Sequence, residues 1–405
     1  MSSRKAHPVV FGILIIPFGV LGGYLSVAVG YMLQHAGISV ETIAGLVAAG
    51  LVPHTWKFLW APIADTTLTR KAWYWISAVV VALGVFATGA LPATAASLPL
   101  LGIVILLSNI GSTFMGMAAE SLLAYGTDEH EKGRAGGWYQ AGNLGGNGIG
   151  GGAGLFLAQA LPHPWMASAI VGAVCLACGL ALHFVPEPPA THRTGGVLAD
   201  LKNVGKDLWG VAKSQRGFVA LILCFLPLGS GAASGLWSAV ASDWRASANA
   251  VALATGIGSG VLSAAGCVAG GWICDRMDRR YAYASFGVLQ ALCAVGMALA
   301  PHNQTNYVVW TSLYAFITGL TYAGFTAFVL EAMGLGAAAT KYNVFASLSN
   351  MPIWYMTQID GWAHTRFGPS GMLFTEACFG ALGLLLFLSL MTLVRRRKAW
   401  AAAPA

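Results

Sequence analysis

Two charged side chains lie at matched positions inside long apolar runs. Lys57 precedes Asp65 by eight residues, and Glu120 precedes Asp128 by eight. At a rise of about 1.5 Å per residue, each charge lies about 12 Å along a helix from its polar end. Charges at such a depth are costly in an apolar segment and often mark a functional site. If the two helices are neighbours, this equal depth permits an ion pair in which the carboxylate can also exchange a proton.

Two other interpretations of this pair remain open. Lys57 could extend its four-carbon chain toward lipid headgroups instead of pairing. The pair could also only brace two neighbouring helices, with no part in proton exchange.

Other ionisable side chains in apolar runs extend the set of candidate coupling or cavity charges. His54 lies three residues before Lys57 and is a candidate proton relay, and Glu331 lies deep in a later run. Asp360 is expected near the outer end of its run, where water would reach it. Glu376 is expected at the outside of the bundle in a structural role.

Uncharged polar residues recur at helical spacing. Gln140, Asn143 and Asn147 are related as i, i+3 and i+7, which places them on one helix face. A polar face on a membrane helix predicts a water-filled cavity. The same reasoning marks a second set of cavity residues, which consists of Asn343, Asn350, Trp354 and Gln358. The glycine-rich stretch 136–154 is expected to slide against the eighth span.

The elements that carry these residues are membrane helices. Of 405 residues, 57% are hydrophobic and only 9% are charged, whereas soluble domains carry about 25% charged residues. Because a bilayer core needs about 20 apolar residues per helix, the chain divides into twelve predicted spans. They are 8–33, 41–63, 72–92, 97–125, 135–160, 164–185, 216–241, 249–273, 281–300, 305–333, 343–364 and 370–394. The first is interpreted as a retained helix rather than a signal peptide.

The spans form two groups of six around a polar linker. The predicted organisation is a six-helix bundle over 1–185, a cytoplasmic linker over 186–215, a second bundle over 216–394 and a cytoplasmic tail over 395–405. The net charge of +7 comes from clusters between apolar runs, which is a topology signal rather than a nucleic-acid patch. Both termini are therefore predicted to face the cytoplasm. We expect a monomer in the lipid bilayer.

Enzymatic and cofactor chemistry find little support in the sequence. There is no G-x-x-x-x-G-K-[ST] loop for ATP, and the nine histidines lie almost all in loops. All seven cysteines lie in apolar runs, and the pair Cys175 and Cys178 is interpreted as buried structural thiols. We expect no enzyme activity, no metal and no cofactor.

The two halves share a boundary motif. Each places an aspartate at a helix end, followed by basic residues. The residues of this motif are Asp65, Arg70 and Lys71 in the first half, and Asp275, Arg276, Arg279 and Arg280 in the second. The second copy resembles the loop signature G-x-x-x-D-R-x-G-R-R/K of the major facilitator superfamily, with Asp278 in place of a glycine. That resemblance implies two pseudo-symmetric bundles of six helices, and a cytoplasmic gate formed by these residues.

Further stretches resemble one branch of that superfamily, the AmpG-like permeases. Lys57 to Asp65 reads KFLWAPIAD, and it resembles that branch's K-F-L-W-[SA]-P-[LI]-x-D segment. Glu120 stands where the branch has an aspartate, and Val185 to Pro188 resembles the P-E-P that closes its sixth helix. The branch carries muropeptides, acetyl-CoA and some siderophores.

These observations predict a secondary transporter in a bacterial inner membrane. We expect proton-coupled import of a small-to-medium polar organic solute by alternating access, with the cargo in the muropeptide, siderophore or acetyl-CoA class. The alternatives are a proton-driven exporter of drugs or metabolites and a transporter-like membrane sensor. The short linker disfavours the sensor, because it leaves no room for an output domain.

Overall fold

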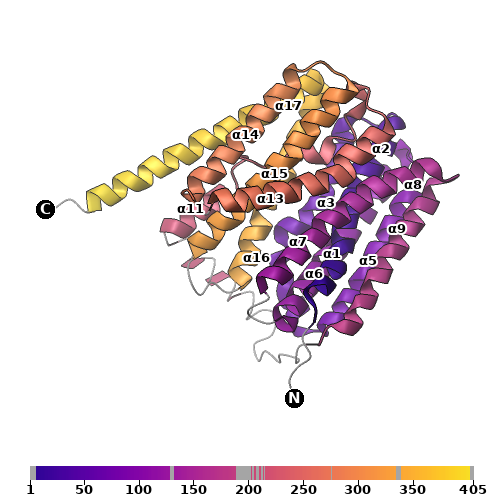
Figure 1. Cartoon of the computed structure of the whole chain (residues 1–405), viewed down its shortest axis with the longest axis horizontal. Helices are drawn as coiled ribbons and strands as arrows, with labels where there is room; N and C mark the ends of the chain where they lie inside the picture. The colour runs from indigo at the N-terminus through magenta and orange to yellow at the C-terminus, as the bar shows by residue number, and fades with distance from the viewer. Residues whose placement is uncertain are drawn as a thin grey trace.

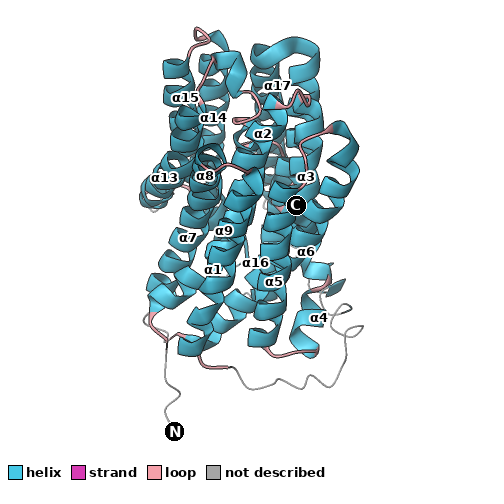
Figure 2. Ribbon diagram, turned by 90° about the vertical axis from the view of Figure 1, so that its right-hand side faces the viewer, coloured by secondary structure: helices cyan, strands magenta, loops and turns pink. Residues whose placement is uncertain are grey.

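In the computed structural model, all regular elements in the described part of the chain are helices (Figures 1 and 2). The structure describes residues 6–127, 132–187, 215–274, 276–333 and 339–401, together with isolated positions between 202 and 213. In Figure 1 the N-terminal half, in indigo to magenta, lies beside the C-terminal half, in orange to yellow. The prediction of an all-α membrane bundle is confirmed.

The N-terminal half contains long helices, several of them interrupted by short tighter or wider turns. Its elements are α1 (Pro8–Gly23), η1 (Tyr24–Val29), α2 (Gly30–His35), α3 (Val40–Trp56), η2 (Lys57–Leu59), α4 (Ala61–Thr66), α5 (Arg70–Ala90), η3 (Ala95–Ser97), α6 (Leu98–Gly126), α7 (Lys132–Gly148), η5 (Ile149–Ala153), α8 (Gly154–Ala160), α9 (Pro164–Cys178) and η6 (Gly179–Phe184).

The C-terminal half follows the same plan with a more broken first span. Its elements are α11 (Gln215–Leu223), η7 (Ala232–Leu236), η8 (Ala241–Trp244), α12 (Ala248–Val251), η9 (Ala252–Gly258), α13 (Ser259–Cys274), α14 (Arg279–Leu299), α15 (Gln304–Met333), α16 (Ala339–Leu348) and α17 (Asn350–Ala401). Gly368 has φ of 71° inside α17, so the eleventh and twelfth predicted spans meet there at a sharp bend.

Eight helical segments in the described residues are long and apolar enough to cross a membrane. One of them, Val344–Thr392, contains two of the predicted spans. The three predicted spans without such a segment have a visible reason. The second is interrupted by η2, the fifth is diluted by glycine, and the seventh is broken. The twelve-span prediction is therefore consistent with the structure.

The seventh span is not the continuous helix that was expected over 216–241. Regular helix ends at Leu223, and Gly229 and Gly231 adopt φ of 67° and 69°. Left-handed backbone of this kind is easily adopted only by glycine, and Pro227 also removes a backbone donor. The apolar composition of this stretch concealed the break.

Tyrosines from neighbouring helices satisfy the backbone that the break exposes. Tyr283 donates a hydrogen bond to Leu228 O at 2.8 Å, and Tyr355 donates one to Phe225 O at 2.7 Å. Irregular backbone is tolerated at membrane depth only where such partners are available. The break is therefore a stabilised part of the C-terminal half, of the kind found in membrane proteins with discontinuous helices.

The glycine-rich fifth span, which begins with α7, packs most closely against α1, and it also contacts the eighth span as expected. A Cβ atom added at Gly142 or Gly146 would overlap the α1 backbone. The eighth span is the second neighbour, because Gly148 and Gly152 approach Gly256 of η9. The fifth span thus contacts α1 of its own half through one set of glycines, and the eighth span of the other half through a second set.

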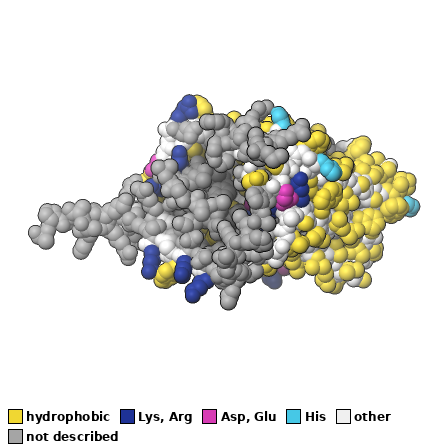
Figure 3. Space-filling model, turned by 90° about the horizontal axis from the view of Figure 1, so that it is seen from below, with side chains coloured by type: hydrophobic (Ala, Val, Ile, Leu, Met, Phe, Trp, Pro, Cys, Tyr) yellow, Lys and Arg dark blue, Asp and Glu magenta, His cyan; other side chains and the backbone are white. Residues whose placement is uncertain are grey.

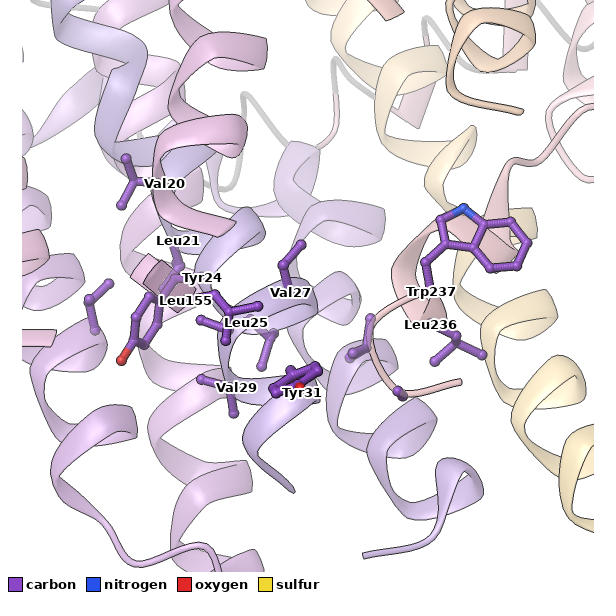
Figure 4. Close-up of a cluster of buried hydrophobic side chains, with 14 of the residues drawn as sticks. Val20, Leu21, Tyr24, Leu25, Val27, Val29, Tyr31, Leu155, Leu236 and Trp237 are labelled. Carbon is purple, nitrogen blue, oxygen red and sulfur yellow. The ribbon is translucent and has the colours of Figure 1, made fainter. Parts of the chain in front are cut away.

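The halves close over each other at the end that the charge pattern predicts to face outside, here called the outer end. Ser238 donates a hydrogen bond to Ser26 O, and Gln34 Nε2 donates one to Ser242 Oγ at 2.7 Å. Beneath these bonds, residues of η1 and η7 share one buried apolar cluster (Figure 4). The labelled members of that cluster include Leu25, Val27, Leu236 and Trp237.

The outside of the bundle is suited to lipid. Large apolar side chains are exposed along several helices, among them Leu83 at 61% and Val268 at 76%. Figure 3 shows a broad hydrophobic flank, while Lys and Arg side chains gather on the other part of the visible face. This separation is the surface expected of a multi-pass membrane protein.

Candidate functional site

Lys57 and Glu120 meet inside the N-terminal half. Lys57 Nζ lies 4.0 Å from Glu120 Oε1, and the side chains are 16% and 37% exposed. The chain tightens into the 3-10 turn η2 where α3 ends, and this turn presents Lys57 to α6. Of the two orientations considered from the sequence, the structure shows the pair and not the extension toward headgroups.

A third residue completes this contact from the fifth span. Tyr139 Oη donates a hydrogen bond to Glu120 Oε1 at 3.4 Å. The long distances of both interactions leave the carboxylate loosely held and partly open to water. The sequence reasoning missed Tyr139, although it directly precedes the polar face that begins at Gln140.

His54 belongs to the same interior surface, one turn from Lys57. Its Nε2 atom lies 3.2 Å from Asn109 Oδ1 and 3.4 Å from Ser112 Oγ, both on α6. The ring of Phe18 packs edge-on against it at 5.2 Å between centroids. Asn109 and Ser112 were not predicted, but their i, i+3 spacing on an apolar helix was the available signal.

The polar face of the fifth span points away from lipid. Trp138 and Ile149 are 43% and 41% exposed and mark its lipid-facing side. At 100° per residue, Gln140, Asn143 and Asn147 lie on the opposite side of the helix. Gln140 is exposed and the two asparagines are half-buried. These positions are those expected of cavity-lining residues.

The C-terminal half contributes a pocket with an empty volume of about 460 Å³, including its open mouth. Its polar lining consists of Ser230, Tyr283, Thr321, Tyr322, Ser349 and Asn350. Among the second set of predicted cavity residues, Asn350 lines this pocket. Gln358 is exposed two turns further along α17, and its Nε2 atom donates to Trp354 O at 3.5 Å.

Phe58 provides a contact between the halves that was not predicted. It is 8% exposed and belongs to an apolar cluster whose other members come from the C-terminal half, including Val344, Phe345 and Leu348. Because Phe58 is next to Lys57 in η2, the same turn holds the interior charge and touches the opposite half.

The predicted cytoplasmic gate is described only in part. Asp275 and the side chains of Asp65, Glu331 and Asn343 lie outside the described residues. Arg70 donates hydrogen bonds to Ala64 O and, at 3.1 Å, to Ser121 Oγ. The gate therefore stays a prediction.

Both basic loops are also ordered by local contacts. The Glu187 carboxylate accepts hydrogen bonds from the Arg70 and Lys71 amides at 2.8 and 3.3 Å, which caps the N-terminus of α5. In the second half, the Arg276 guanidinium stacks on Trp272 at 3.9 Å from the ring centroid. Asp278 accepts from the Arg280 amide at 2.9 Å, and its carboxylate lies 3.9 Å from Arg280 Nε.

Asp360 and Glu376 are not at water-exposed or peripheral positions, contrary to expectation. Asp360 is 0% exposed and Glu376 is 7% exposed. Tyr314 donates a hydrogen bond to Glu376 Oε1 from α15. The expectation failed because the neighbours that bury the two acids come from other spans.

The chain matches known proteins over most of its length. Residues 9–353 match the family model described as Major Facilitator Superfamily. The structure is similar to the xylose transporter XylE from E. coli, with TM-score 0.69 and 15% identity over 95% of this chain and 98% of that chain. It is also similar to a D-xylose-proton symporter, with TM-score 0.73 and 14% identity over 94% and 96% of the two chains. A third similar structure is the nucleoside transporter NupG, with TM-score 0.72 and 13% identity over 94% and 98%.

Proposed function

The chain belongs to the Major Facilitator Superfamily and is a transporter, not an enzyme, and from this premise we propose that it imports a polar organic solute together with protons. Alternating access of its two halves would carry the solute across a bacterial inner membrane. Support for the coupling comes from the Lys57–Glu120 pair in the interior of the N-terminal half. Lys57 Nζ lies 4.0 Å from Glu120 Oε1, so the carboxylate is loosely held.

The pair suits a proton switch because its two states differ in charge. With Glu120 ionised, the carboxylate is held by Lys57 and by the Tyr139 hydroxyl. Protonation of Glu120 removes the charge attraction, which releases Lys57 to bind polar groups of a solute. Binding of proton and solute would then be linked through one site.

The cargo is expected to be polar and to carry little net charge. The surface around the Lys57–Glu120 pair offers one lysine, one carboxylate and His54, and amide and hydroxyl groups come from α7 and from the C-terminal pocket. This composition matches sugars, amides and zwitterions better than polyanions. The KFLWAPIAD resemblance favours cargoes of the AmpG-like branch, namely muropeptides, siderophores and acetyl-CoA-like molecules. Among these, acetyl-CoA is a polyanion and therefore fits this interior least well.

Uptake into proteoliposomes tests the proposal. The purified chain would be reconstituted with an imposed pH gradient and supplied with muropeptides, siderophores, acetyl-CoA and D-xylose as separate probes. A one-proton symporter should accumulate its cargo up to about tenfold per pH unit. Glu120→Gln should abolish this accumulation while leaving downhill exchange intact, because the neutral side chain cannot release a proton.

Glu41→Gln is the matched control, because Glu41 is an exposed acid at the outer end of α3. It should transport like the unmodified chain. Gradient-independent uptake of the cargo, or full accumulation by Glu120→Gln, would refute the coupling.

A further inference from the structure

A second pair of acids is buried in the C-terminal half, away from Lys57 and Glu120. Asp360 and Glu376 both lie on α17, on opposite sides of the bend at Gly368. Both carboxylate oxygens of Asp360, and Oε2 of Glu376, are buried without a hydrogen-bond partner. Tyr314 donates to the remaining oxygen of Glu376.

The two carboxyl groups act on each other electrostatically, and the described residues supply no cation to balance them. Neither acid forms a salt bridge with a Lys or Arg of the described part. The titratable groups that act on the two acids directly are Cys293 on α14 and Tyr314 on α15, whose ordinary forms at neutral pH carry no charge. Further titratable groups on the surrounding elements include Asp243 on η8, Glu41 on α3, and His364 and Arg366 on α17, where Arg366 lies over the ring of Trp362 at 5.9 Å, together with His302, whose Nε2 lies 3.3 Å from Ser370 Oγ of α17.

Two ionised carboxylates could not remain in this site. An unpaired buried charge is strongly unfavourable, and two like charges side by side repel each other further. In the described residues the donors to the pair are neutral, namely the Tyr314 hydroxyl and the Ala233 backbone amide, both to Glu376. At least one of the two acids must therefore be protonated in the conformation seen here.

The pair lies directly behind the surface that closes the outer end. Asp360 precedes Gly361, which packs so closely on α3 that an added Cβ would overlap Ala44. Tyr314 packs edge-on against Trp237 at 5.1 Å between ring centroids, and Trp237 belongs to the interhalf cluster of Figure 4. In the closed outer end, the N-terminal half thus packs on α17 at the residue next to Asp360.

A hydrogen-bonded pair links this site toward the outer surface. His364, one turn from Asp360, has its Nε2 atom 2.7 Å from Asp243 Oδ2. The two side chains are 16% and 27% exposed, so water reaches them. A proton can thus be supplied from the outer side while the halves are apart.

We propose that Asp360 and Glu376 form a proton-binding site that faces the outer side, and that the outer end closes only when this pair is neutralised. The inference rests on the alternating access of the proposed function, but it concerns a different site from Glu120. Each closure of the outer end would carry a proton into the protein on this pair. If the outer end reopened before the pair had released that proton, the proton would return to the outer side.

Distance measurements between spin labels test this directly, without a known cargo. Labels on Ala95→Cys and Asn303→Cys, both in exposed outer loops of opposite halves, would report the outer opening in the full chain in nanodiscs. Cys267 and Cys378, which are the cysteines that are not buried, would first be replaced by serine. Over about pH 5 to pH 9, the ratio of closed to open molecules should fall up to about tenfold per pH unit above the midpoint.

Variants of the acids test whether Asp360 and Glu376 are the groups whose titration changes this ratio. The double variant Asp360→Asn and Glu376→Gln should stay closed over the whole range, because it cannot ionise. Glu41→Gln removes an exposed acid near the same helix contact and should keep the normal pH response. A pH-independent ratio in the labelled chain that keeps both acids overturns the proposal, as does an unchanged response in the double variant.

Two further outcomes separate this inference from the proposed function. If sodium, but not potassium or choline, restores closure at high pH, the site binds a metal cation and the proton assignment is wrong. If the outer end opens and closes without any pH response, alternating access stands and only this inference fails. If no opening occurs under any condition, both fail.

Discussion

At the scale of single residues, the position of a charge along its helix was predictable, whereas its surroundings were not. Lys57 and Glu120 lie at equal depth because both are eight residues from an aspartate at a helix end, and the structure joins them at 4.0 Å. Asp360 and Glu376 carry no such spacing signal. Their burial depends on Tyr314, from a third span.

A double-mutant cycle measures the coupling between Lys57 and Glu120. Lys57→Ala and Glu120→Ala should each lower the initial rate of cargo uptake by about tenfold or more, because each leaves one charge uncompensated. The double variant should lose less than the product of the two single effects. Multiplicative losses would show that the two residues act independently. Binding of the cargo in detergent distinguishes lost affinity from lost turnover.

At the scale of elements, composition predicted helices but not their interruptions or neighbours. The glycines of 136–154 predicted close packing, yet they do not say which helix approaches. The structure gives α1 the closest contact and the eighth span the second. The prediction of a continuous helix for the seventh span was wrong. Tyr283 and Tyr355 stabilise its broken backbone from neighbouring helices, and the residues of the span itself do not indicate these partners.

The glycine contact predicts different effects for two adjacent substitutions in α7. A Cβ at Gly146 would overlap Ile16 O, whereas a Cβ at Gly145 would meet nothing within 4 Å. Gly146→Ala should destabilise the protein by about 1–3 kcal/mol through overpacking. Gly145→Ala should be neutral or stabilising by up to about 1 kcal/mol, since alanine favours helix. Thermal unfolding in detergent, followed by fluorescence-detected chromatography, compares them. Equal melting temperatures would contradict the packing described.

At the scale of the whole molecule, the two halves meet at the outer end and again at Phe58. The outer end is closed by η1 against η7 and by α3 against α17, while Phe58 touches the C-terminal half below. Between these contacts lie the Lys57–Glu120 pair and the C-terminal pocket. Transport requires these contacts to break and reform in turn.

The contact of α3 with α17 predicts a variant that cannot close. Gly361→Ala places a methyl group against Ala44, so the outer halves should remain apart even at low pH. The labelled outer loops should then report the longer distance, and uptake should fall by about tenfold or more. Gly45→Ala, also on α3 but with nothing within 4 Å of its added Cβ, should behave normally. A normal closed distance in Gly361→Ala would argue against this contact as the outer seal.

By itself, the sequence determined that the chain is a membrane bundle of two related halves, because apolar length and basic clusters are local properties of the chain. It also determined the equal depth of Lys57 and Glu120, because helical rise turns residue spacing into distance. Only the tertiary structure decided that Asp360 and Glu376 are buried beside the outer seal. Burial is a property of contacts between distant segments, and helical periodicity identifies a face of a helix without identifying what covers it.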